Sequence, residues 1–372
     1  MTKAAELAKM GEVLTNSQIG GRRNIIINGA MNIAQRSTSE TGLGASTGYF
    51  TVDRVQSGHS GNSAGRYTMT QEAITDLGGF KNAIKLACTT ADTSVASNEW
   101  EYLAYKIEAQ DLHSLKFGTS DAEKFTISFY VKGNASATYT LGAYIHDADR
   151  WMAKTFSVTT SWSRVSLTFE ADTVGTINDD NGLGLIFYIT LQVGSDRTSG
   201  SIPSTWETLA TADIADSNQT QFFDSTSRTF FITGLQVEVG EQATPFEHRS
   251  FGEELALCQR YFQRVGGESG VGSAYAGLGV GHMFNNTTAF LRGNWNDMRS
   301  APSMSLSGAF RVINMVTDTN HTSSVALTQS EFGTNSGYYK LTFGSASATR
   351  GDGCRLDRNN DKTAALLLDS EL

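Results

Sequence analysis

Alternation of apolar and polar side chains in short segments limits the possible folds of this chain more than any other feature. Phe125–Val131 carries apolar residues at every odd-numbered position, and Val165–Glu170 and Leu235–Val239 repeat the same period of two. Successive side chains of a strand point to opposite faces, so this period predicts strands with one buried face. Leu183–Val193 is apolar at nearly every position, which is typical of a strand covered on both sides.

Other β-rich segments extend this pattern, and clusters of Gly, Asn, Asp and Ser separate them. No helical stretch between them is long enough for a parallel crossover, so the strands are expected to pair antiparallel. The sequence therefore predicts an all-β fold in which residues 24–250 form a jelly-roll β-sandwich. The further predicted strands are Asn24–Gly29, Arg66–Ile74, Asn82–Cys88, Trp100–Ala109, Thr138–Ile145 and Trp151–Val158.

A helical period interrupts the β pattern after residue 250. Leu255, Cys258 and Phe262 recur three and four residues apart, with acidic residues before them and arginines after them. This arrangement complements the helix dipole and predicts a linking helix over residues 251–264. A Gly-rich stretch and short strands follow, which predict a second, small β-sandwich over residues 265–372. Its strands are expected at Ala289–Leu291, Met304–Leu306, Phe310–Val316, Val325–Leu327, Tyr338–Phe343 and Ala364–Leu368.

Charge and composition exclude several classes of partner. The net charge is −9 and no cationic run is longer than Arg22–Arg23, so nucleic acid is not an expected partner. No stretch approaches the ~20 apolar residues of a membrane span, so membrane insertion is not expected. Met1–Leu14 lacks the apolar core of a signal peptide and is expected to form a short amphipathic helix that needs a partner surface. The chain is therefore expected to be synthesised in the cytoplasm.

The cysteines and glycines give no sign of a cofactor. Cys88, Cys258 and Cys354 lie far apart in the sequence and are expected to be buried thiols rather than disulfides or metal ligands. Gly42–Gly48 has the wrong spacing for a dinucleotide-binding loop and no βαβ unit surrounds it. No cofactor is expected.

Aromatic residues beside polar ones are the candidate ligand-binding residues, because sugars stack on flat rings and pair their hydroxyls with polar groups. Trp100 and Tyr102 are two apart and would share one strand face; packing in the core or in a trimer interface is favoured over a sugar platform. Trp295 and Tyr338 lie in or beside polar loops, where contact with a receptor competes with core packing. His321, between Asn320 and Thr322, is a weaker candidate of the same kind.

Acidic residues provide two further hypotheses, neither of them favoured. Asn178–Gly182 contains Asp179 and Asp180, which could hold Ca²⁺, although a solvated turn is the preferred interpretation. A glycan depolymerase would need two carboxyl groups across a cleft, and Asp147 with Asp149 or Glu99 with Glu101 have a suitable spacing. Any acidic chain of this length contains such pairs, so no catalytic residue is assigned.

Four segments resemble proteins of phages that infect marine bacteria, notably cyanophages. Ala4–Arg36 (AAELAKMGEVLTNSQIGGRRNIIINGAMNIAQR) resembles the start of their tail fibre proteins. Leu235–Arg249 (LQVEVGEQATPFEHR) is similar to the closing strand of their carbohydrate-binding-module-like jelly roll, and Phe251–Phe262 to the helix that follows it. Met298–Leu306 (MRSAPSMSL) is similar to the start of a strand in their small distal β domain.

This resemblance implies a non-enzymatic, homotrimeric virion protein that is part of a tail appendage. Residues 1–23 would attach it to other tail or virion proteins, and its C-terminal end would contact polysaccharide or lipopolysaccharide on the host surface. Three alternatives stay open: a glycan-depolymerising tailspike, a capsid fibre, and a purely structural virion component. Because the jelly roll is expected to begin by Asn24, the long N-terminal tail-binding domain usual in such proteins is not expected within residues 1–23, which leaves the mode of attachment open.

Overall fold

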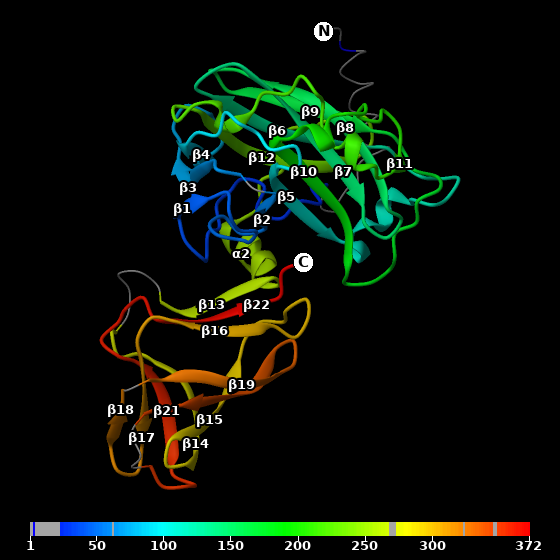
Figure 1. Ribbon diagram of the computed structural model, residues 1–372. Coiled ribbons are helices and arrows are strands. Elements are labelled where there is room, and N and C mark those ends of the chain that lie inside the picture. The colour runs from blue at the N-terminus through cyan, green and yellow to red at the C-terminus, as the bar shows by residue number, and fades with distance from the viewer. Residues whose placement is uncertain (1–2, 4–22, 62, 268–272, 323, 345–347) are drawn as a thin grey trace. The chain divides into compact units, whose positions relative to one another are not determined.

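The computed structural model describes residues 3, 23–61, 63–267, 273–322, 324–344 and 348–372 (Figure 1). The chain divides into two compact units, one reaching to Leu255 and including Leu372, the other comprising Ala256–Glu371. Each unit is described by itself. Apart from Lys3 and Arg23, the predicted attachment segment 1–23 and its helix lie outside the described residues. Among the residues that are described, no helix has both the length and the apolar character needed to cross a membrane.

The first unit consists of two six-stranded antiparallel sheets, named A and B here (Figure 1). The chain passes from one sheet to the other many times, with β2 in B, β3 and β4 in A, β5 in B, β6 in A and β7 in B. This wrapping confirms the predicted jelly-roll sandwich. In spatial order, sheet A is β1(Ser39–Leu43), β3(Arg66–Ala73), β4(Asn82–Thr90), β12(Thr229–Val239), β6(Phe125–Gly133) and β9(Ser163–Phe169), and sheet B is β11(Glu207–Thr208), β8(Arg150–Val158), β7(Ala137–Ile145), β10(Leu183–Val193), β5(Trp100–Glu108) and β2(Val55–Ser60).

The core of this unit lies between the two sheets and follows the predicted alternation. Phe125, Ile127, Phe129 and Val131 of β6 are all 0% exposed. Phe125 stacks on Phe169 of the neighbouring β9 with ring centroids 5.1 Å apart. Burial of a side chain of this size stabilises the fold by about 1.5–3 kcal/mol, so this one strand contributes several kcal/mol.

The predicted strand Asn24–Gly29 is wrong, because this segment is irregular. Asn28 has a φ of 62°, in the left-handed region. The Asn24 side chain accepts hydrogen bonds from the backbone N–H groups of Ile26 and Val237, each at 3.0 Å. The asparagine side chain here supplies bonds that a neighbouring strand would otherwise provide, and backbone bonds at Ile25 and Gly29 fasten the segment to β12 without making it a strand.

The linking helix is shorter than predicted. Helix α2 (Phe251–Gln259) ends at Gln259 rather than Arg264, and β13 (Phe262–Gly266) follows almost at once. Residues Phe262–Gly266 pair with β22 (Ala365–Asp369), and Phe262 is 2% exposed. Burial against a strand far away in the sequence therefore overrides the helical period of this segment.

The second unit is the predicted small β-sandwich, built from a three-stranded sheet C and a seven-stranded sheet D. Side chains from both sheets, such as Leu366 and Leu291, share one apolar core. The Gly-rich stretch contains the start of a strand that was not predicted, β14(Gly277–Asn285). Its Gly279 lies against the Tyr339 hydroxyl, which would be 2.2 Å from a Cβ at this position, so the strand needs a glycine here. In spatial order, sheet C is β13, β22 and β16(Ser303–Ser307), and sheet D is β18(Thr319–His321), β17(Phe310–Asn314), β21(Gly353–Arg358), β14(Gly277–Asn285), β15(Thr288–Asn294), β20(Ser336–Thr342) and β19(Ala326–Phe332).

Cys88, Cys258 and Cys354 are buried thiols, as predicted. Burial raises the pKa of the Cys354 thiol to about 12, so it stays protonated at neutral pH. A thiol in that state is a poor nucleophile and a poor metal ligand.

Candidate functional site

The outer face of sheet B carries three partly exposed aromatic residues, Trp100, Tyr102 and Tyr188, which we name the aromatic cluster. Trp100 and Tyr102 lie on β5 and Tyr188 lies on the adjacent β10. The ring centroid of Trp100 is 4.4 Å from that of Tyr102 and 5.1 Å from that of Tyr188, and the two tyrosine rings are 5.0 Å apart. Leu103, next to Tyr102, and Phe187 and Ile189, on either side of Tyr188, pack into the core, so alternation turns these rings outward.

Glycines on neighbouring strands position the rings of this face. Gly58 of β2 is the cross-strand partner of Tyr102, and a Cβ on Gly58 would lie 2.4 Å from the tyrosine ring. Likewise, a Cβ on Gly142 of β7 would lie 1.8 Å from the ring of Trp151. Trp151 is 1% exposed, its ring centroid lies 6.0 Å from that of Tyr188, and it packs beside Trp100 and Tyr188 on the same face of sheet B.

Polar groups border the aromatic cluster and fix its orientation. The Trp100 indole N–H donates to the Thr190 hydroxyl at 3.1 Å. The guanidinium of Arg197 lies 5.3 Å from the centre of the Trp100 ring and donates to the Ser60 hydroxyl at 3.1 Å. Burial raises the pKa of Tyr102, and that of Tyr188, above the ordinary value. Both phenol groups are therefore neutral near pH 7 and can donate as well as accept hydrogen bonds.

The three rings do not form a single plane. The Trp100 and Tyr102 rings are inclined by 43°, and the Tyr102 and Tyr188 rings by 84°. A sugar ring would therefore stack on one aromatic face while touching the edge of another, with Arg197 in reach of its hydroxyl groups. This is the combination of flat apolar surface and a few oriented polar groups that carbohydrate binding requires.

The candidates of the second unit lie apart from one another. Trp295 is half-buried: its indole donates to the Thr334 carbonyl oxygen at 3.0 Å and its ring meets Phe332 edge-on. Tyr338 is 53% exposed and alternates with the buried Tyr339, so it lies on the outer face of sheet D. A Cβ on Gly293 would lie within 3.3 Å of both the Trp295 and Tyr339 rings, which places Trp295 on the core side.

His321 requires a correction. It is 0% exposed and stacks on Phe343 with ring centroids 4.4 Å apart. Its ring therefore has no surface for a receptor, because it fills part of the second core.

The Asn178–Gly182 turn does not gather the ligands that Ca²⁺ needs. Asp179 forms an ion pair with His113 at 3.1 Å, and Asp180 accepts a hydrogen bond from the Gly182 N–H at 2.8 Å. No group of three or more His, Cys, Asp or Glu side chains suited to a metal ion occurs among the described residues. We therefore place no metal site here.

The carboxylate pairs considered for glycan cleavage are engaged in the fold. Glu99 and Glu101 are both 0% exposed, and Glu99 accepts a hydrogen bond from Gln192 at 2.7 Å. Asp147 accepts two hydrogen bonds from Asn178, and Asp149 accepts one from the Tyr144 hydroxyl. A polymer cannot reach a pair of carboxyl groups that is closed off from solvent, so Glu99 and Glu101 do not form a hydrolytic pair.

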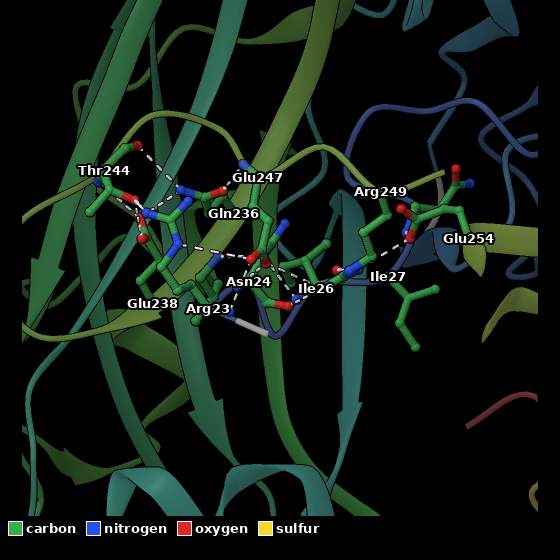
Figure 2. A network of polar contacts seen from close by, with 12 residues as sticks. Arg23, Asn24, Ile26, Ile27, Gln236, Glu238, Thr244, Glu247, Arg249 and Glu254 are labelled. Atoms are coloured by element: carbon green, nitrogen blue, oxygen red, sulfur yellow. Dashed lines mark hydrogen bonds and ion pairs between the residues drawn. The ribbon is translucent and has the colours of Figure 1, made fainter. Parts of the chain in front are cut away.

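Residues in the segments that resemble phage proteins form a polar network within the first unit (Figure 2). Arg249 donates to the carbonyl oxygens of Asn24 and Ile26 and forms an ion pair with Glu254 at 3.3 Å. Glu254 accepts a hydrogen bond from the Asn28 N–H at 2.5 Å. We name this group, Asn24, Ile26, Asn28, Arg249 and Glu254, the Arg249 clamp; it joins the two ends of the jelly roll.

A second part of the same network holds the Arg23–Asn24 backbone against the C-terminal half of β12 (Figure 2). Glu247 accepts a hydrogen bond from the Asn24 N–H at 2.9 Å, and its own N–H donates to Gln236 at 2.8 Å. Glu238 accepts a hydrogen bond from the Thr244 N–H at 3.0 Å. These bonds tie residues 23–28 to the residues around β12 and so stabilise the fold of the first unit.

Tyr188, Arg197 and Gly58 were not predicted as parts of a site. Tyr188 lies in a segment that is apolar at nearly every position and was therefore predicted to be covered on both faces. Arg197 lies in the short 3-10 helix η2 (Ser195–Arg197), which belongs to an irregular connection. The one local sign that Tyr188 could face solvent is its polar hydroxyl group. Nothing local in the sequence marked Gly58 as the partner of Tyr102.

This geometry defines the first unit as a β-sandwich that carries aromatic residues on one outer face. No protein-family model matches the chain, and no curated protein matches it. Among solved structures, the chain is similar to a family 4 carbohydrate-binding module, with 12% identity and a TM-score of 0.29, covering 57% of this chain and 97% of that one. It is also similar to a family 61 module in complex with β-1,4-galactotriose, with 8% identity and a TM-score of 0.30, covering 59% and 99%.

A third similar structure is the family 11 carbohydrate-binding module of a cellulosomal cellulase of Clostridium thermocellum, with 10% identity and a TM-score of 0.26, covering 55% of this chain and 100% of that one. All three TM-scores are below 0.5. The strand order of the first unit itself defines its jelly-roll architecture.

Proposed function

We propose that the protein is a non-enzymatic glycan-binding protein whose first unit binds neutral polysaccharide on the outer face of sheet B. The observation that carries this proposal is the aromatic cluster, in which three half-buried rings lie within 5.1 Å of one another beside Arg197. Partly exposed aromatic rings are costly to leave in water and are well suited to the apolar faces of pyranose rings. Neutral tyrosine hydroxyls and one guanidinium would pair the sugar hydroxyls.

The proposed biological setting is a virion appendage that adheres to host-surface glycan. The sequence resemblance of Ala4–Arg36, Leu235–Arg249, Phe251–Phe262 and Met298–Leu306 to phage tail fibre proteins supports this setting. In it, the chain is a homotrimer, and residues 1–23 attach it to other virion proteins. Three copies acting together would turn weak individual sugar contacts into firm attachment through avidity.

Affinity electrophoresis tests the glycan-binding proposal. Gels containing β-1,4-galactan, xylan or mixed-linkage β-glucan serve as probes, and we expect at least one to retard the full-length protein. Tyr102→Ala should weaken that binding about tenfold, which corresponds to about 1.4 kcal/mol. Tyr130→Ala is the matched control, because Tyr130 is a half-buried tyrosine on β6 of sheet A.

The proposal fails if none of the three polymers retards the protein, or if Tyr130→Ala loses binding as fully as Tyr102→Ala. The mass of the retained polymer distinguishes adhesion from cleavage, because a falling mass would identify a depolymerase. The proposed role in a virion appendage is tested separately. Mass photometry should show a particle of three chains, and antibodies against the protein should label intact virions. A monomer that is absent from virions would overturn the setting and leave the glycan site in place.

A further inference from the structure

The outer face of sheet D combines exposed cations with exposed apolar side chains. Four residues on four adjacent strands form one row across it: Arg355 on β21 pairs with Val280 on β14, which pairs with Arg292 on β15, which pairs with Tyr338 on β20. In the next row, Phe290 of β15 pairs with Lys340 of β20. We name these six residues the basic–aromatic patch.

Apolar surface in this patch is unusually open to solvent. Val280 is 63% exposed and Tyr338 is 53% exposed, although both lie in the middle of strands. Phe290 stacks with His282 at 6.1 Å and meets Phe284 edge-on at 5.2 Å, and Phe284 is itself 41% exposed. The opposite face of the same strands forms the core of the second unit, so these side chains cannot be buried by the sheet to which they belong.

The charge of the patch is positive within a chain whose net charge is −9. In the part of the chain that the structure describes, neither Arg292 nor Lys340 forms an ion pair with a carboxylate. Arg355 shares the buried Asp357 with Arg311, each at 3.2 Å, so two guanidinium groups meet a single carboxylate. The nearby acidic residues are Glu331, opposite Tyr338 on β19, and Asp352, which accepts a hydrogen bond from Asn314.

We propose that the basic–aromatic patch is a second binding surface, and that its ligand is an acidic polysaccharide. Carboxylates of the polymer would pair with Arg292, Lys340 and Arg355, and the apolar faces of its sugar rings would stack on Tyr338 and Phe290. Neighbouring strands lie about 4.8 Å apart, so the row of four residues extends over about 14 Å. An open row of this length suits an extended polymer that lies across the strands.

Two other occupants fit the patch less well. In a symmetric pair of copies, the same patch would face itself and bring arginines opposite arginines, which is repulsive. A nucleic acid would be attracted by the cations, but the negative net charge of the whole chain would oppose it at longer range. An acidic polysaccharide carries fewer charges per unit length than a duplex and offers the apolar ring faces that match Tyr338.

Binding of the full-length protein to immobilised polygalacturonate tests this proposal, with neutral β-1,4-galactan as the comparison. We expect polygalacturonate to bind and its affinity to fall as salt rises, because surface charges are screened. The double variant Arg292→Gln and Lys340→Gln should bind it at least tenfold more weakly, and Tyr338→Ala several-fold more weakly. The control is Lys362→Gln, an exposed lysine in the connection between β21 and β22, which should leave the affinity unchanged.

If Lys362→Gln lost as much affinity for polygalacturonate as the double variant, the proposal would be overturned, because binding would then depend on the overall charge of the protein alone. Absence of polygalacturonate binding, or stronger binding to single-stranded poly(dT), would overturn it as well. The test is independent of the sheet B site: Tyr102→Ala should keep polygalacturonate binding, and the double variant should keep binding to neutral polymers. Unchanged thermal melting of each variant shows that the fold is intact.

Discussion

Arg249 and Glu254 form an ion pair whose side chains are only 5% and 11% exposed, and both also bind the backbone of residues 24–28. Charges removed from water to this extent need complete pairing, since each is costly to bury alone. The pair therefore joins the beginning of the jelly roll to its end through bonds that are strongly interdependent.

Arg249→Met should destabilise the first unit by about 3–5 kcal/mol, because it leaves Glu254 buried without its cation and removes two bonds to carbonyl oxygens. The midpoint of urea unfolding measures this loss. Lys116→Met removes an exposed ion pair to Glu123 and should leave the midpoint in place. Similar midpoints for the two variants would contradict the role of the Arg249 clamp.

Glu101 should make stability decrease as pH rises. Burial raises the pKa of its carboxyl to about 8; the Tyr67 hydroxyl opposes this shift and Glu99 adds to it. The folded protein therefore holds a proton that the unfolded chain releases near pH 4.5. The free energy of unfolding should fall by about 1.4 kcal/mol per pH unit between about pH 5 and 8. Glu101→Gln should abolish this slope, whereas Glu123→Gln, on the surface, should retain it.

Gly142→Ala should destabilise the protein, because the added methyl group would lie 1.8 Å from the ring of Trp151. Trp151 is 1% exposed and has no room to move, so a cost of about 1–3 kcal/mol or more is expected. Gly78→Ala is the control, since a Cβ there would meet nothing within 4 Å. Urea unfolding of both variants gives the comparison, and an unaffected Gly142→Ala would show that the indole ring does not lie on this glycine.

His321 should weaken the second unit at low pH. Burial lowers the pKa of its imidazole below 6.5, so the folded protein binds this proton less readily than the unfolded chain. Stability should therefore decrease as pH falls through about 6.5 and below. His321→Phe, which preserves the stacking on Phe343, should remove this dependence, while His282→Gln should not. Hydrogen exchange of the β17 and β18 amides between pH 7 and 5 would reveal the difference.

Strands with strict alternation could be predicted from the sequence, because one buried face imposes a period of two whatever the neighbours are. Phe125–Val131 and Leu235–Val239 lie within β6 and β12. The failures occurred where a distant part of the chain decides the local structure. Asn24–Gly29 is held by the Asn24 side chain and by backbone bonds to β12 at Ile25 and Gly29 without becoming a strand, and Phe262–Gly266 leaves the helix to pair with β22.

The candidate site was only partly predictable for the same reason. Trp100 and Tyr102 share a face because they are two residues apart on one strand, which the sequence shows directly. Tyr188 lies beside them because β10 is the neighbour of β5 in sheet B, and Gly58 lies opposite Tyr102 because of the register between β2 and β5. Both relationships depend on which strands become neighbours. His321 was misplaced because polar neighbours in the sequence do not reveal that its ring points into the second core.

The Arg249 clamp also has a mechanical consequence. If the first unit were pulled apart at Arg23 and Leu255, the load would be shared by the bonds of Arg249 to Asn24 and Ile26 and by the bonds of Asn24 and Ile25 to Val237 of β12. A tether that grips a surface under flow experiences tension of this kind. The clamp would resist it with several hydrogen bonds loaded at once, so the two ends of the jelly roll would stay joined while the chain is strained.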